Sequence, residues 1–102
     1  MERKKLEPHE VDERLAKLDG WTVADHRLMR RFAFENFAES LRFVNQVGEI
    51  AEGLDHHPDI KFGWGYAELS STTHDRGGIT DFDFELAARI NRIAQNEKTA
   101  AN

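Results

Sequence analysis

Three histidines occupy two short polar segments of the chain and are its best candidates for chemistry. His56 and His57 are adjacent and stand directly before Pro58, whereas His74 stands just before a pair of glycines. A free imidazole has a pKa of about 6.5, so it can give or take a proton near neutral pH. Two such groups beside a bound substrate suffice to eliminate water, with no metal and no covalent intermediate. These residue types therefore indicate general acid/base chemistry.

Two carboxylates are placed to serve these histidines. Asp83 stands one turn before Leu86, so it begins the apolar stripe of a predicted helix. An unpaired buried charge is very unfavourable, and a nearby histidine is the expected partner. Asp83 is equally well placed to cap that helix together with Thr80, and the two roles are compatible. Glu52 lies one turn before His56 and is either a second partner or a solvated helix residue.

Three helices are predicted from their caps and their apolar stripes. The first begins at Pro8 and ends by Gly20, and the second begins with a capping box of Asn36 and Glu39. The third is opened by Thr80. The predicted stripes consist of Val11, Leu15 and Leu18, of Phe37, Leu41, Val44, Val47, Ala51 and Leu54, and of Leu86, Ala87, Ile90, Ile93 and Ala94.

Four strands are predicted between these helices. They cover residues 21–24, 28–34, 60–62 and 66–73, and form two hairpins with turns at residues 25–26 and 63–65. Hairpins favour an antiparallel sheet. The predicted fold class is therefore α+β, a four-stranded antiparallel sheet with three helices packed on one face, in the order α-β-β-α-β-β-α. Both histidine segments join a strand to a helix, so we expect them at the same edge of the sheet.

The composition indicates one small globular domain, predicted to span residues 1–102. The chain is 39% hydrophobic and 32% charged, as folded proteins are. It has no cysteine, which excludes disulfides and thiolate zinc sites, and no apolar run of membrane-spanning length. A formal net charge of -5 argues against direct nucleic-acid binding, which depends on Lys and Arg. Residues 1–10 do not form a secretory signal, so the cytoplasm is the default prediction.

Two aromatic residues near the second hairpin turn have two interpretations. Trp64 and Tyr66 could stack on a flat heterocycle, if they lie on the same side as the histidines. Residues of this kind more often serve packing or an interface between chains.

The two histidine segments resemble the pterin-4a-carbinolamine dehydratase family. Residues 52–58 match its E-x-x-x-H-H-P pattern. Residues 73–83 match a second motif, in which a Thr-His pair precedes a glycine and an Asp ends the motif. The Leu-x-Gly-Trp at residues 18–21 also fits, and the resemblance extends from about Leu6 to Ala94. One departure is Arg76, where many relatives carry Cys or a small residue.

This resemblance implies a hydro-lyase that acts on a pterin. Members of the family expel water from 4a-hydroxytetrahydropterin, which aromatic amino-acid hydroxylases release. The product is quinonoid dihydropterin, which is recycled to tetrahydrobiopterin. The resemblance also implies the α+β fold, a homodimer or homotetramer, and no cofactor or metal.

The resemblance further implies a role for each site residue. The catalytic set comprises His56 and His74 as the acid/base pair, with His57 and Asp83 beside them. The substrate-binding set comprises His57, which orients the pterin, together with Glu52 and Thr73.

Two other functions are compatible with the same residues. Three histidines could bind zinc, although adjacent histidines are awkward chelators and H-E-x-x-H is absent. The chain could instead be a non-catalytic module on the same fold, acting in dimerisation, coactivation or assembly. The glycine pair lacks the strand-glycine-helix context of a phosphate-binding loop, so a tight turn is the interpretation.

Overall fold

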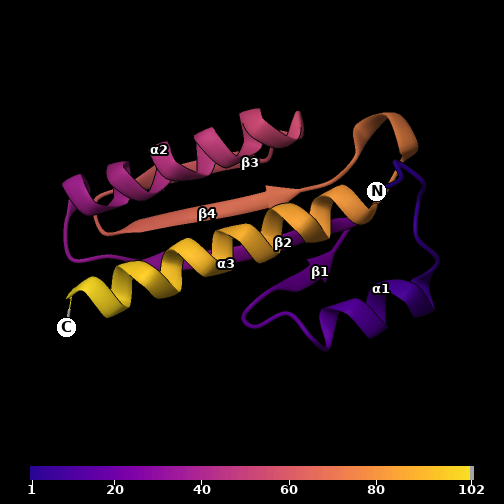
Figure 1. Cartoon of the computed structure of the whole chain (residues 1–102), viewed down its shortest axis with the longest axis horizontal. Helices are drawn as coiled ribbons and strands as arrows, with labels where there is room; N and C mark the ends of the chain where they lie inside the picture. The colour runs from indigo at the N-terminus through magenta and orange to yellow at the C-terminus, as the bar shows by residue number, and fades with distance from the viewer. Residues whose placement is uncertain (102) are drawn as a thin grey trace.

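A four-stranded antiparallel sheet forms the centre of the molecule. The computed structural model describes residues 1–101, with side chains as far as Gln95. The strands are β1 (Thr22–Ala24), β2 (Arg27–Ala33), β3 (Asp59–Gly63) and β4 (Tyr66–Ser71), and their spatial order is β1-β2-β4-β3. Each consecutive pair, β1–β2 and β3–β4, is a hairpin, and β2 joins the hairpins by pairing with β4 (Figure 1).

Both hairpin turns contain backbone in the left-handed region. Asp25 and His26 have φ angles of 52° and 60°, as a two-residue turn with the twist of its strands requires. In the second turn, Gly65 has a φ angle of 82°, a conformation that glycine adopts at little cost. The turn predicted at residues 25–26 is therefore confirmed. The second turn is one residue shorter than predicted, because Gly63 is paired with Tyr66 in the sheet.

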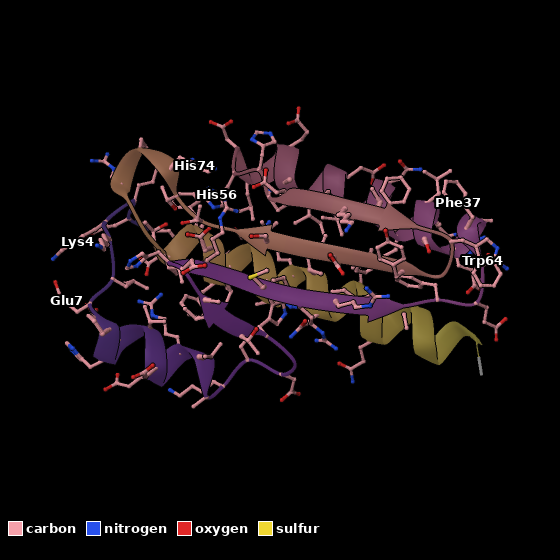
Figure 2. The ribbon with its side chains drawn as sticks, turned by 180° about the vertical axis from the view of Figure 1, so that it is seen from behind. Lys4, Glu7, Phe37, His56, Trp64 and His74 are labelled. Carbon is pink, nitrogen blue, oxygen red and sulfur yellow. The ribbon has the colours of Figure 1, made fainter. Side chains whose placement is uncertain are left out.

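Two long helices, α2 (Phe37–Leu54) and α3 (Asp81–Ala101), pack against each other and cover one face of the sheet (Figures 1 and 2). The short helix α1 (Pro8–Leu15) lies beside β1, and its partly buried Val11 and Leu15 pack against the core. This helix ends before Gly20, although Leu18 still contacts the core. A 3-10 turn, η1 (His74–Arg76), links β4 to α3. The predicted α+β class and element order are confirmed.

The buried face of α2 differs from the predicted stripe. Phe37 and Leu41 are 46% and 39% exposed, whereas Ser40 and Phe43 are fully buried. The ring of Phe43 lies 4.7 Å from that of Phe32 on the sheet, which selects the face that turns inward. Ser40 is tolerated there because its hydroxyl donates to the carbonyl of Asn36 at 3.1 Å. The prediction that Phe37 and Leu41 belong to the core was wrong.

The start of α2 follows the predicted cap in part. The Asn36 side chain accepts the backbone N–H of Glu39 at 2.9 Å, as an N-cap should. The carboxylate of Glu39 accepts the N–H of Glu35 instead of that of Asn36, so the reciprocal bond of a capping box is displaced by one residue.

In the part of the chain that the structure describes, no helix is both long and apolar enough to cross a membrane.

Candidate active site

The register of the second hairpin brings the two histidine segments together. Asp59, at the start of β3, is paired with Ser70, near the end of β4. The residues that precede β3 and those that follow β4 therefore meet at one end of the sheet. Figure 2 shows His56 and His74 at this end of the molecule.

The end of α2 directs His56 inward. Asp55 has a φ angle of 51°, which breaks the helix, and the N–H of His56 returns to the carbonyl of Ala51 at 3.1 Å. The ring is 5% exposed, and its Nε2 lies 2.6 Å from Oδ1 of Asp83, which is fully buried. His56 is thus the histidine partner that we predicted from the position of Asp83 in the apolar stripe.

Asp83 is held by further donors besides His56. Ser71 donates to Oδ1 at 2.5 Å, while Thr73 and the backbone N–H of Thr80 donate to Oδ2 at 2.8 and 2.9 Å. The Thr80 bond is the reciprocal half of a capping box at the start of α3. One carboxylate thus caps the helix and binds the histidine.

The hydrogen bonds keep Asp83 ionised despite its burial. Burial alone raises the pKa of its carboxyl group, because it removes water from the charge. The bonds from His56, Ser71, the Thr80 N–H and Thr73 outweigh burial and hold the pKa below its ordinary value. The structure therefore presents His56 with a fixed buried anion.

The remaining predicted residues differ in their exposure. His57 and Glu52 form an exposed pair through Nε2 and Oε2. His74 is exposed on η1, directly after Thr73. Thr73 itself is buried, and its hydroxyl contacts both Asp83 and Thr80, so its side chain holds the Asp83 carboxylate in place.

Three contacts of the site were missed by sequence reasoning. The hydroxyl of Ser71 donates a hydrogen bond to Oδ1 of Asp83, the same oxygen that His56 contacts. The ring of Phe82 lies 5.9 Å from that of His56, and the guanidinium of Arg3 lies 4.1 Å from the centroid of Phe82. No local pattern marks Arg3, because its partners are about fifty and eighty residues away along the chain.

The aromatic pair near the second turn does not serve the histidines. Trp64 and Phe37 lie at the end of the sheet opposite His56 and His74 (Figure 2). Tyr66 is paired with Gly63 at that same distant turn, and Arg31 lies over its ring. Within one chain these residues therefore do not reach a ligand at the histidine site, and Phe82 is the aromatic side chain beside His56.

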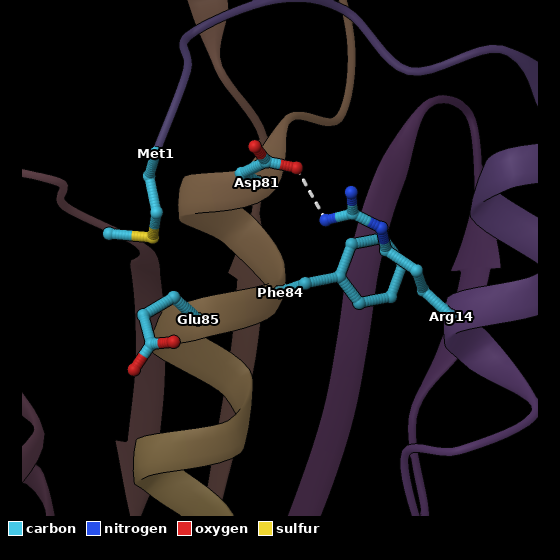
Figure 3. Close-up of a pocket in the computed structure, with 5 residues that line it drawn as sticks. All are labelled: Met1, Arg14, Asp81, Phe84 and Glu85. Carbon is cyan, nitrogen blue, oxygen red and sulfur yellow. Dashed lines mark ion pairs between the residues drawn. The ribbon is translucent and has the colours of Figure 1, made fainter.

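A hollow of about 320 Å³ lies near the start of α3, but it is not formed by the histidines. Its lining consists of Met1, Arg14, Asp81, Phe84 and Glu85, with an ion pair between Arg14 and Asp81 (Figure 3). Among the described residues, no three His, Asp or Glu side chains gather in a way that could hold a metal ion.

The chain belongs to the pterin 4 alpha carbinolamine dehydratase family, whose model matches residues 4–93. A relative from Rubrobacter xylanophilus, provisionally named as such a dehydratase, is 55% identical over 83 residues, covering 79% of this chain and 78% of the relative. A relative from Sulfolobus acidocaldarius with the same provisional name is 42% identical, covering 87% and 98%.

Solved structures share the fold. A protein from Brucella melitensis, described as a transcriptional coactivator/pterin dehydratase, is 33% identical and has a TM-score of 0.85, covering 89% of this chain and 99% of that one. A pterin dehydratase-like protein described as a RuBisCO assembly factor in the alpha-carboxysome has a TM-score of 0.60 at 24% identity, covering 72% and 86%. The second similarity concerns the fold alone.

Proposed function

We propose that this protein is a dehydratase that removes water from 4a-hydroxytetrahydropterin and yields quinonoid dihydropterin. The observation that carries the proposal is the buried His56–Asp83 pair, which lies at the same end of the sheet as the exposed His57 and His74. Membership of the family supports the pterin as the substrate.

The reaction needs one proton donor and one proton acceptor. The donor protonates the hydroxyl group of the carbinolamine, the carbon–oxygen bond breaks, and water leaves. The acceptor removes the proton of the neighbouring ring nitrogen, so that a carbon–nitrogen double bond forms. In our proposal His56 and His74 fill these two roles, and general acid/base groups of this kind contribute about 10²–10⁴-fold to a rate.

The other residues bind or hold the reacting groups. Exposed His57, paired with Glu52, contacts the pterin and orients it. Oδ1 of Asp83 fixes the ring of His56, and Thr73 holds Asp83 by donating a hydrogen bond to its other oxygen, Oδ2. We place the activity in the recycling of tetrahydrobiopterin in the cytoplasm.

We also propose that the chain forms a homodimer or homotetramer. The large apolar side chains of Phe37, Leu41 and Trp64 are 46%, 39% and 72% exposed, and the ring of Phe37 stacks on Phe62 at 5.8 Å. Such side chains, gathered on one surface, favour an interface. The same surface favours the second candidate function, a non-catalytic coactivator or assembly module.

The decisive experiment follows the ultraviolet absorbance of freshly generated 4a-hydroxytetrahydropterin with parent protein, with variants and with buffer alone. We expect the parent to exceed the buffer rate. His74→Ala should reduce turnover by about 10²-fold or more without changing thermal stability, because the side chain is exposed. His57→Ala should raise KM more than it lowers kcat. His9→Ala, which replaces an exposed histidine on α1, is the matched control.

Folded parent protein that fails to exceed the buffer rate would favour the binding module instead. If the activity of the parent is retained in both His57→Ala and His74→Ala, the family assignment stands and the assignment of the active site is refuted.

A further inference from the structure

The segment before α1 lies along the candidate site. The N–H of Leu6 donates to the carbonyl of Ile79 at 2.9 Å, and the N–H of Glu2 donates to Asp81 at 3.3 Å. Residues 2–6 are therefore held beside the segment that carries Asp83, and Arg3 lies between these two attachment points.

Arg3 is anchored beside His56 by two contacts that do not involve the histidine ring. Its Nη2 donates to the carbonyl of Asp55 at 2.8 Å, and its guanidinium lies 4.1 Å from the centroid of Phe82. With these contacts in place, Nη1 lies 3.4 Å from Nδ1 of His56. This last contact is long for a hydrogen bond, but it places a permanent cation next to that nitrogen.

The two ring nitrogens of His56 thus face opposite charges. Nε2 faces the carboxylate of Asp83, which can only accept a hydrogen bond. Nδ1 faces the guanidinium of Arg3, which can only donate one. The ring also lies beside Ser71 and Phe82, which are uncharged. Nε2 is therefore the ring nitrogen placed to donate to Asp83, and Nδ1 is the nitrogen whose lone pair faces the positive charge of Arg3.

We propose that Arg3 is a positioning residue that keeps Nδ1 of His56 unprotonated and available as a proton acceptor. This inference rests on the proposed function, to which it adds a direction: His56 takes the proton from the pterin ring nitrogen, and His74 supplies the proton to the departing hydroxyl. The low pKa of Asp83 is consistent with this arrangement, because the arrangement requires a negatively charged carboxylate at Nε2 as well as a cation at Nδ1.

The test is ¹⁵N NMR of the histidine ring nitrogens in the full chain without substrate. A nitrogen without a proton resonates far from one that carries a proton, so the spectrum reports the state of Nδ1 directly. The variants are Arg3→Met, which removes the cation, Arg3→Lys, which retains it, and Lys4→Met. Lys4 is exposed in the same segment, so its variant is the matched control for net charge. His56→Gln assigns the resonances.

We expect Nδ1 of His56 to be unprotonated in the parent at neutral pH. In Arg3→Met the protonation equilibrium of Nδ1 should move by about tenfold toward the protonated form, the size expected of one partly solvated charge at this distance. Arg3→Lys should lie between the parent and Arg3→Met, and Lys4→Met should match the parent. In the dehydration assay, Arg3→Met should lower kcat more than it raises KM.

Two spectral results would overturn the proposal: a protonated Nδ1 in the parent, or the same Nδ1 state in Arg3→Met and the parent. If the spectra agree with the proposal and the parent does not dehydrate the pterin, the charge assignment stands and the proposed function fails.

Discussion

The replacement Asp83→Asn tests the structure most sharply, because it removes a charge and changes little volume. Each carboxylate oxygen accepts two hydrogen bonds, from His56 and Ser71 on one side and from Thr73 and Thr80 on the other. An amide has only one oxygen, and its nitrogen donates. The hydroxyls can rotate away from that nitrogen, but the backbone N–H of Thr80 cannot. Turning the amide to satisfy Thr80 presents a donor to Nε2 of His56.

The magnitude follows from these contacts. Leaving one buried donor without an acceptor costs about 1–3 kcal/mol, and a hydrogen bond to a charged group contributes about 1.5–3 kcal/mol. We therefore expect Asp83→Asn to lower the free energy of unfolding by about 2–4 kcal/mol. For a domain of this size the melting temperature should fall by about 10–30 °C.

Urea unfolding, followed through the fluorescence of the buried Trp21, measures this loss. Asp81→Asn is the matched control, because Asp81 also stands in the first turn of α3. Asp81 pairs with Arg14 near the surface, and an ion pair of that kind contributes about 1 kcal/mol or less. If Asp83→Asn and Asp81→Asn destabilised the protein equally, the buried hydrogen-bond network would not have the importance assigned to it.

Three further predictions follow. The pKa of Asp83 is lowered in the folded state. Its contribution to stability is therefore complete above its unfolded pKa of about 3.9 and is lost as the pH falls through the folded value. Urea midpoints measured from pH 5 down to pH 2 should fall more steeply in the parent than in Asp83→Asn. Asn36→Ala should cost about 1 kcal/mol in urea unfolding, because it removes the acceptor of the Glu39 N–H, and an unchanged midpoint would argue against the cap. Phe37→Ser combined with Leu41→Ser should lower the mass measured by light scattering without unfolding the chain, whereas an unchanged mass would place the interface elsewhere.

Most of the fold could be predicted because its signals are local. The left-handed turn at Asp25 and His26 and the cap at Asn36 depend on residues a few positions apart. The inward face of α2 is different, since it depends on which stripe meets the sheet. Ser40 has a polar side chain and lies in the core, while Leu41 has an apolar side chain and is exposed, because packing of Phe43 sets the rotation of the helix.

The candidate site could be predicted only where its residues share a motif or a strand end. His56 and His74 follow from the element order, since the two segments adjoin the paired ends of β3 and β4. Arg3 and Phe82 could not be found in this way. Their contacts with His56 depend on how the segment before α1 lies along the sheet, and that path has no signature in the local sequence.

The double role of Asp83 predicts that stability and the proposed chemistry are coupled in this site. Its carboxylate caps α3 through the N–H of Thr80 and, through its other oxygen, fixes His56. A residue chosen only as a cap would be free to remain at the surface, and one chosen only to bind a histidine would not need a helix N-terminus. Because both partners share one buried anion, replacement of Asp83 should lower stability and turnover together. His74 is exposed and makes no such contribution to the core, so its replacement should affect turnover alone.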